Sequence, residues 1–138
     1  MKNRLLCLVF AAAFAFPAYA ATALSTLRYI PDITVNLGGT VVGPSDLASD
    51  TLAGAPTLSL SALPANLAAY YYTGSVYWMV FDTTVALPGS ITATPRDIIS
   101  WNGSAYSKLF DGVTAGIPDG AAIDALSSTN GTDYLLSF

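Results

Sequence analysis

Short apolar runs alternate with turn residues along most of the chain, and this pattern predicts strands rather than helices. The runs are rich in Val, Ile, Thr, Tyr and Phe, and dipeptides such as Asn-Gly and Pro-Gly separate them. The segment 47–67 comes closest to helical spacing, but Gly54, Pro56 and Pro64 interrupt it. We therefore predict an all-β protein with about eight to ten strands, each of roughly five to eight residues.

Three hairpins are predicted, each with a tight turn between two apolar strands. Asn-Gly favours the type I′ turn, because both central residues of that turn need a positive φ. The three spans and their turns are 97–110 with Asn102-Gly103, 122–138 with Asn130-Gly131, and 67–81 with Thr73-Gly74.

One pattern occurs twice in the same order. Residues 32–40 (DITVNLGGT) match 82–90 (DTTVALPGS), and 44–47 (PSDL) match 95–98 (PRDI). The third block matches Gly74, Tyr77, Met79 and Phe81 with Gly131, Tyr134, Leu136 and Phe138. We predict an internal duplication with units at 32–81 and 82–138, each an antiparallel meander of about four strands.

The second unit, with DIISWNGSAYSKLFDG followed by IDALSSTNGTDYLLSF, resembles repeats of uncharacterised secreted bacterial proteins. Those repeats are similar to propeller blades, loosely of the kelch kind. Propellers typically have about 4–8 blades, whereas this chain has two predicted units. The resemblance therefore leaves two arrangements open. Either the units pack as a sandwich, which we rank first, or several chains assemble into a propeller-like ring as a homo-oligomer.

The first 20 residues have the three parts of a cleavable secretory signal peptide. Lys2 and Arg4 form a positive start, 5–16 is an unbroken apolar run, and Ala18-Tyr19-Ala20 precedes the expected cut before Ala21. The apolar run is shorter than the roughly 20 residues of a membrane-spanning helix. We expect a single β domain at 21–138 that is secreted or periplasmic.

Charge and composition then exclude several functions. Beyond the predicted cut, Arg28, Arg96 and Lys108 stand against nine aspartates, and the net charge is −6. Such a chain is a poor partner for nucleic acid, whose affinity comes from neutralised phosphates. The only cysteine, Cys7, lies in the predicted signal peptide, and the chain contains no His and no Glu. We expect no enzyme, no cofactor and no resident metal.

The candidate binding residues are aromatic. Tyr70-Tyr71-Tyr72 corresponds to Ser127-Ser128-Thr129 in the second unit, so a duplicated core does not require it. Tyr70, Tyr72 and Trp78 are our predicted ligand-binding residues, because aromatic side chains offer stiff contact area to a glycan or a cell-surface protein. The role that we favour is a non-enzymatic surface or matrix component, or a binding module.

Three alternatives are kept. The loop 111–120, with Asp111 and Asp119, offers oxygen ligands for calcium, although Asp-Gly is an ordinary turn dipeptide. The alternation of Tyr134, Leu136 and Phe138 is similar to the last strand of an outer-membrane barrel. A pair of aspartates acting on a glycoside would make a secreted hydrolase.

Overall fold

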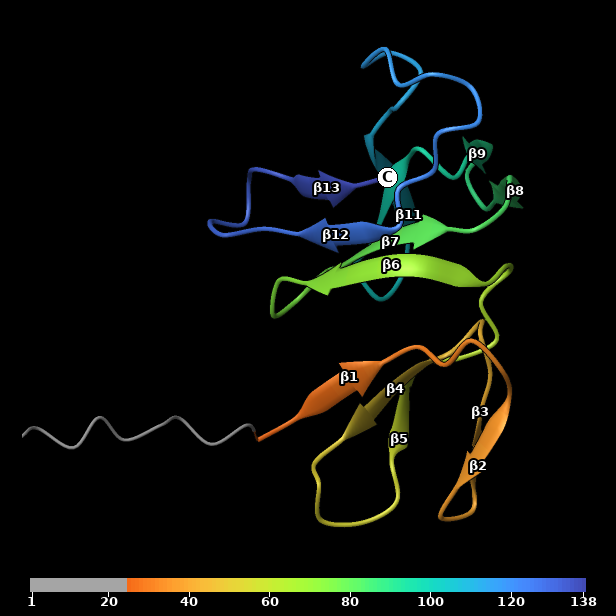
Figure 1. The fold of residues 1–138 in the computed structure, drawn as a ribbon, viewed down its shortest axis with the longest axis vertical. Helices are drawn as coiled ribbons and strands as arrows, with labels where there is room; N and C mark the ends of the chain where they lie inside the picture. The colour runs from red at the N-terminus through yellow and green to blue at the C-terminus, as the bar shows by residue number, and fades with distance from the viewer. Residues whose placement is uncertain (1–24) are drawn as a thin grey trace, which may run out of the picture.

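The structure, a computed structural model, describes residues 25–138 and contains only strands and turns in that range (Figure 1). The predicted signal peptide therefore lies outside the described residues. The strands are β1 (Leu27–Tyr29), β2 (Val35–Leu37), β3 (Thr40–Val42), β4 (Leu47–Asp50), β5 (Thr57–Leu60), β6 (Leu67–Tyr72), β7 (Tyr77–Phe81), β8 (Val85–Leu87), β9 (Ile91–Ala93), β10 (Ile98–Trp101), β11 (Tyr106–Phe110), β12 (Ala125–Ser127) and β13 (Leu135–Ser137). The all-β class is confirmed.

The strands are more numerous and shorter than predicted. Thirteen strands form, and they run from three residues in β1 to six in β6. The Gly-Gly and Pro-Gly turns at 38–39 and 88–89 each close a hairpin of three-residue strands, where we expected longer ones. No bilayer-spanning helix occurs among the residues that the structure describes.

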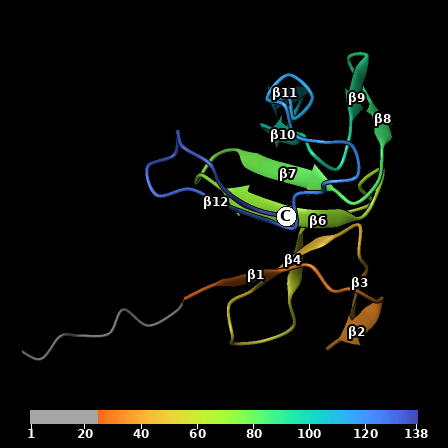
Figure 2. The same cartoon turned by 45° about the horizontal axis from the view of Figure 1, so that its top comes forward.

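All strand pairs are antiparallel, and they form three main sheets and two small hairpins. The central sheet has the order β11-β10-β7-β6, the N-terminal sheet has the order β1-β4-β5, and the C-terminal sheet is β12-β13. The hairpins are β2-β3 and β8-β9, and Figure 2 shows the second of these beyond the end of β7. None of the sheets closes on itself within residues 25–138.

The central sheet is the middle layer of a sandwich-like stack. Met79, Phe81 and Ile99 lie on its first face, where Ile30, Leu60 and Leu63 from the N-terminal part pack against them. Trp78, Val80 and Ile98 lie on its second face, beside Leu126 and Leu136 of the C-terminal sheet. Figure 1 shows the N-terminal and C-terminal sheets on opposite sides of β6 and β7. Because both of its faces are covered, β7 is an unbroken apolar run rather than an alternating one.

The central sheet takes two strands from each predicted unit. The strands β6 and β7 belong to the range 32–81, whereas β10 and β11 belong to 82–138. Neither predicted unit therefore forms a separate four-stranded sheet of its own. Strand β10 pairs with the edge of β7 that β6 does not occupy. Its register places Met79 opposite Ile99 and Tyr77 opposite Trp101.

Two hairpins share one irregular register. The β4–β5 pair shifts between Leu47 and Ala48, and the β10–β11 pair shifts between Ile98 and Ile99. Such a shift places one extra residue in the partner strand, which bends the hairpin.

Two aspartates hold the loops before these hairpins in matching ways. Oδ2 of Asp46 accepts a hydrogen bond from the Gly43 N–H at 2.8 Å, and Oδ1 accepts one from the Ala62 N–H at 2.8 Å. Oδ2 of Asp97 accepts from the Thr94 N–H at 2.9 Å, and Oδ1 accepts from the Gly112 N–H at 2.9 Å. Each carboxylate therefore ties its own turn to a chain segment some 15 residues further on.

The Asp97 carboxylate lies in the more buried and more closely packed of the two environments. The Asp97 side chain is fully buried, and the Lys108 ammonium donates to it at 2.9 Å. A Cβ added at Gly112 would lie 2.3 Å from the carbonyl oxygen of Arg96, so only glycine fits where this backbone meets the turn. Burial by itself raises the pKa of the Asp97 carboxyl. The hydrogen bonds from Lys108, Gly112 and Thr94 outweigh burial, and the net pKa lies below its usual value.

This lowered pKa predicts a loss of stability in acid. A carboxylate whose pKa is lower in the folded than in the unfolded chain stabilises the fold above the unfolded pKa, about 3.9. The contribution disappears as the pH falls through the folded-state pKa. We expect the free energy of unfolding, measured in urea, to fall from about pH 5 to about pH 2, and to fall less in Asp97→Asn. A parent protein whose stability stays level over that range would contradict the assignment.

Candidate functional site

The three residues predicted to bind a ligand lie on two different faces of the central sheet. Tyr70 pairs with Met79 and Tyr72 pairs with Tyr77, so both tyrosines belong to the first face. Trp78 belongs to the second face, where only 6% of it is exposed and its ring packs 5.2 Å from Tyr71. Tyr70, Tyr72 and Trp78 therefore do not form one shared surface.

Tyr70 connects two sheets. Its hydroxyl donates a hydrogen bond of 2.7 Å to the carbonyl oxygen of Arg28 in β1. Burial raises the pKa of the Tyr70 phenol, although the nearby Arg28 charge opposes that rise. The hydroxyl thus stays protonated and holds the N-terminal sheet against β6.

Four aromatic side chains cross the first face of the central sheet in a single row. Strand pairing places Tyr72 opposite Tyr77, Tyr77 opposite Trp101, and Trp101 opposite Tyr106. The ring centroids are 4.6 Å apart for Tyr72 and Tyr77, and 4.4 Å apart for Trp101 and Tyr106. We call these four residues the aromatic row. Each is half-buried and so still meets solvent, and the rings of Tyr77, Trp101 and Tyr106 also pack on the core.

Charged and polar groups flank the aromatic row. The Arg28 guanidinium carbon lies 4.5 Å from the centroid of the Tyr72 ring, which is a cation–π contact. The Tyr72 hydroxyl donates to the Gly74 carbonyl oxygen at 2.6 Å and so fixes the turn at that end. Burial raises the pKa of the Tyr106 phenol. Among residues 25–138, neither the Tyr77 nor the Tyr106 hydroxyl has a hydrogen-bond partner, so both are available to a bound molecule.

A polar turn lies beside the Trp101–Tyr106 end. Oδ1 of Asn102 accepts hydrogen bonds from the Ser104 N–H at 3.0 Å and from the Ala105 N–H at 2.9 Å. These bonds shape the Asn-Gly turn, and the turn holds Trp101 and Tyr106 opposite each other across β10 and β11. The exposed turn therefore offers backbone and side-chain polar groups next to flat apolar rings.

The N-terminal sheet has no comparable row. At the positions equivalent to Trp101 and Tyr106, the β4–β5 hairpin has Asp50 and Pro56. The same bulged hairpin therefore forms without aromatic residues there. Because packing does not require the row, binding is a stronger explanation for it. Trp101 is not among the residues that the sequence predicted to bind a ligand. A two-residue turn at Asn102-Gly103 would have placed Trp101 opposite Ser104, whereas the connection spans residues 102–105 and places Trp101 opposite Tyr106. The sequence pattern alone therefore did not pair the two rings.

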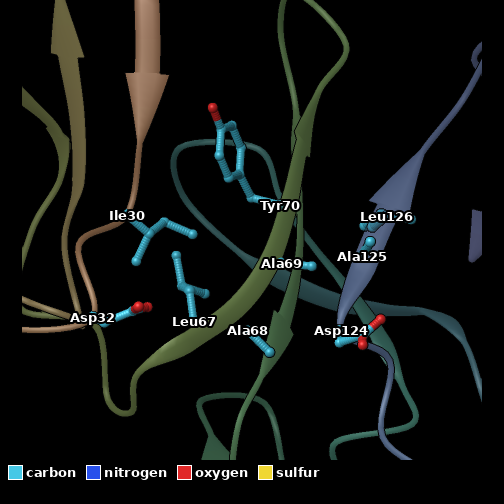
Figure 3. A pocket seen from close by; sticks show the side chains of 9 residues that line it. All are labelled: Ile30, Asp32, Leu67, Ala68, Ala69, Tyr70, Asp124, Ala125 and Leu126. Atoms are coloured by element: carbon cyan, nitrogen blue, oxygen red, sulfur yellow. The ribbon is translucent and has the colours of Figure 1, made fainter. Parts of the chain in front are cut away.

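A second candidate is a depression of about 300 Å³ beside β6 (Figure 3). Ile30, Tyr70 and Leu126 contribute to its lining, together with the carboxylates Asp32 and Asp124. In Figure 3 the two carboxylates lie on opposite sides of the β6 strand, so they do not face each other as a catalytic pair would. The side chains that line this depression do not point toward one common position.

The loop that we considered for calcium uses its aspartates differently. Oδ1 of Asp111 accepts from the Thr114 N–H at 2.9 Å, and Oδ2 accepts from Lys108 at 3.3 Å. Asp119 forms an ion pair with Arg96. Within residues 25–138, no three acidic, His or Cys side chains lie together in a way that could hold a metal ion.

Comparison of the chain with protein-family models, with curated proteins and with solved structures found no match.

Proposed function

We propose that this chain is an exported, non-enzymatic β protein that acts as a surface or matrix component by binding a glycan along the aromatic row. The observation behind the proposal is that Tyr72, Tyr77, Trp101 and Tyr106 come from four adjacent strands and form one line of half-buried rings. Adjacent strands are about 4.8 Å apart, so the row extends about 14 Å. That length suits several sugar rings of one extended chain.

The chemistry of the row favours an uncharged glycan. Aromatic rings present flat apolar faces, and the hydroxyls of Tyr77 and Tyr106 add polar tips. Sugar rings have the same combination of apolar C–H faces and hydroxyl edges. The excess of aspartate over basic residues repels anionic polymers, since only Arg28, Arg96 and Lys108 are basic among the described residues. We therefore place neutral, extended polysaccharides first among the ligands.

We also infer that the chain arose by duplication of one unit, as the two sequence segments 32–81 and 82–138 predict. The matched bulges in β4–β5 and β10–β11 support this inference. The matched hydrogen bonds of Asp46 and Asp97 support it as well. Under this proposal, features without a counterpart in the other unit, such as the aromatic side chains of Tyr72, Trp101 and Tyr106, are the features that were added for function.

The binding proposal predicts a loss of affinity in Trp101→Ala. Buried or half-buried aromatic anchors typically account for about 1–4 kcal/mol of binding when truncated, so we expect at least about a fivefold weaker association. The measurement is co-sedimentation of the purified protein with insoluble cellulose and with chitin. Tyr106→Ser, which changes the adjacent ring, is expected to weaken binding in the same way.

Leu109→Ala is the matched control, because Leu109 is an exposed apolar residue of β11, the strand of Tyr106, and lies outside the row. Its binding is expected to equal that of the parent. Urea unfolding of each variant separates lost affinity from lost folding. Equal sedimentation of parent and Trp101→Ala, or no sedimentation of the folded parent with either polymer, would remove the glycan proposal.

The export part of the proposal has a separate test. Fractionation of the producing cells is expected to place the protein in the periplasm or the medium, with its N-terminus at Ala21. Recovery of an intact N-terminus from the cytoplasm would overturn export and leave the binding measurement untouched.

A further inference from the structure

Three strands of the structure occupy equivalent places. Strand β7 pairs with β10 through Tyr77, Trp78 and Met79. Strand β1 pairs with β4 through Leu27, Arg28 and Tyr29, which are the matching positions one unit earlier. Strand β13 is the second strand of the hairpin 122–138, as β7 is the second strand of the hairpin 67–81, and its residues Leu135 and Leu136 match Trp78 and Met79.

These three strands differ in how their edges are filled. Strand β7 is paired on both edges, by β6 on one side and β10 on the other. Strand β13 is paired by β12 alone, and within residues 25–138 no strand lies on its other edge. An open edge presents unpaired N–H and C=O groups that favour pairing with a further strand. The register of β7 and β10 specifies which strand fits there.

The fitting strand is the equivalent of β10 in the N-terminal sheet, which is β4. The β7–β10 pairing places Met79 opposite Ile99 and Trp78 opposite Ser100. Transferred by the repeat, it places Leu136 opposite Ala48 and Leu135 opposite Ser49. In the same chain, β4 lies on the far side of the central sheet from β13, as Figure 1 shows. The partner must therefore be the β4 strand of another copy.

At present β1 occupies that edge of β4, and it fits imperfectly. The Arg28 side chain stands where β7 has Trp78, and its Nε is buried without a hydrogen-bond partner in the described chain. A buried donor without an acceptor is costly to the fold. Meanwhile Leu135, which holds the same position in β13, is 54% exposed, and Phe138 is 59% exposed. Exchange of β1 for β13 would release the buried Nε and cover exposed apolar surface.

We propose that two copies of this chain exchange strands, so that β13 of each pairs with β4 of the other in place of β1. The result is a composite sheet in the order β12-β13-β4-β5, which has the same arrangement as β6-β7-β10-β11. Reciprocal exchange between two copies gives four complete four-stranded sheets in a closed ring. Four is the smallest number of blades usual for propellers, about 4 to 8. Closure also leaves no free edge at β13 for further growth.

Cysteine pairs test this register directly. The full-length gene is used with Cys7→Ala, so that introduced cysteines are the only thiols. One copy has Ser49→Cys and a second, differently tagged copy has Leu135→Cys. Because these two positions face each other only across the proposed interface, oxidation of the mixture is expected to give mainly the mixed disulfide dimer. Light scattering is expected to give twice the monomer mass for the unmodified protein.

A disulfide that fixes β1 to β4 within one chain is the matched control. Arg28 and Ser49 are cross-strand partners within one chain, so Arg28→Cys with Ser49→Cys is expected to form an internal disulfide. The oxidised protein is expected to be monomeric, and reduction is expected to restore the dimer mass. Strand exchange is overturned if the parent is monomeric at every concentration, or if the locked and oxidised protein keeps the parent's mass.

Discussion

Replacing Phe81 with alanine is expected to lower the free energy of unfolding by about 3–5 kcal/mol. Phe81 is fully buried on the first face of the central sheet, where it packs with Met79, Leu67 and Ile99. Removing the ring deletes its burial and leaves a cavity among neighbours that belong to three different strands. Urea unfolding followed by tryptophan fluorescence measures the loss.

The repeat provides the control for this change. Phe138 holds the place of Phe81 in the second unit, but 59% of its surface is exposed. Phe138→Ala is therefore expected to change the free energy of unfolding by no more than about 0.5 kcal/mol when both variants are measured as monomers. Equal losses in the two variants would show that the core is not where the structure puts it.

Removing the charge of Asp97 is the second change with a large expected effect. Asp97→Asn leaves Lys108 without its buried partner and turns an amide N–H₂ toward the N–H group of either Thr94 or Gly112. Breaking a buried ion pair from one side typically costs about 3–5 kcal/mol. We expect a loss of that size, measured as a lower urea midpoint with an unchanged slope.

Asp46→Asn tests whether burial causes that loss. Asp46 accepts the equivalent two backbone hydrogen bonds, but its side chain is partly exposed and forms no ion pair within residues 25–138. We expect a smaller loss of about 1–3 kcal/mol. A loss at Asp46 that matches or exceeds the loss at Asp97 would mean that the hydrogen bonds alone, rather than the buried charge pair, stabilise these turns.

The local pairings could be predicted from the sequence. The hairpins expected at 67–81 and 97–110 form as β6–β7 and β10–β11, with a glycine of positive φ, Gly74 or Gly103, in each turn. The type I′ turn expected at Asn102-Gly103 is wrong, because only Gly103 has a positive φ and the connection spans the four residues 102–105. The third expected hairpin, at 122–138, forms as β12–β13. In each case the information lies within some 17 residues of the sequence.

The pairing of β7 with β10 could not be predicted from the local sequence. It joins strands about twenty residues apart, and either strand alone is compatible with an edge position. The same difficulty affected the candidate site. Period-two alternation separates Trp78 from Tyr77 but does not say that both faces of β7 are covered. Once β10 lies beside β7, Trp101 joins Tyr72 and Tyr77 in one line, which no linear pattern reveals.

The boundary between the two sequence segments, at 81–82, falls inside the central sheet rather than between sheets. A gene fragment that stopped there would encode β7 without β10, and the other fragment would encode β10 without β7. Each product would expose a long apolar strand edge, the feature most prone to aggregation. The protein therefore cannot be divided into two stable parts at the boundary between its repeats. Insertions and tags are better tolerated at exposed turns such as 102–105, outside the strands, than at the junction of the repeats.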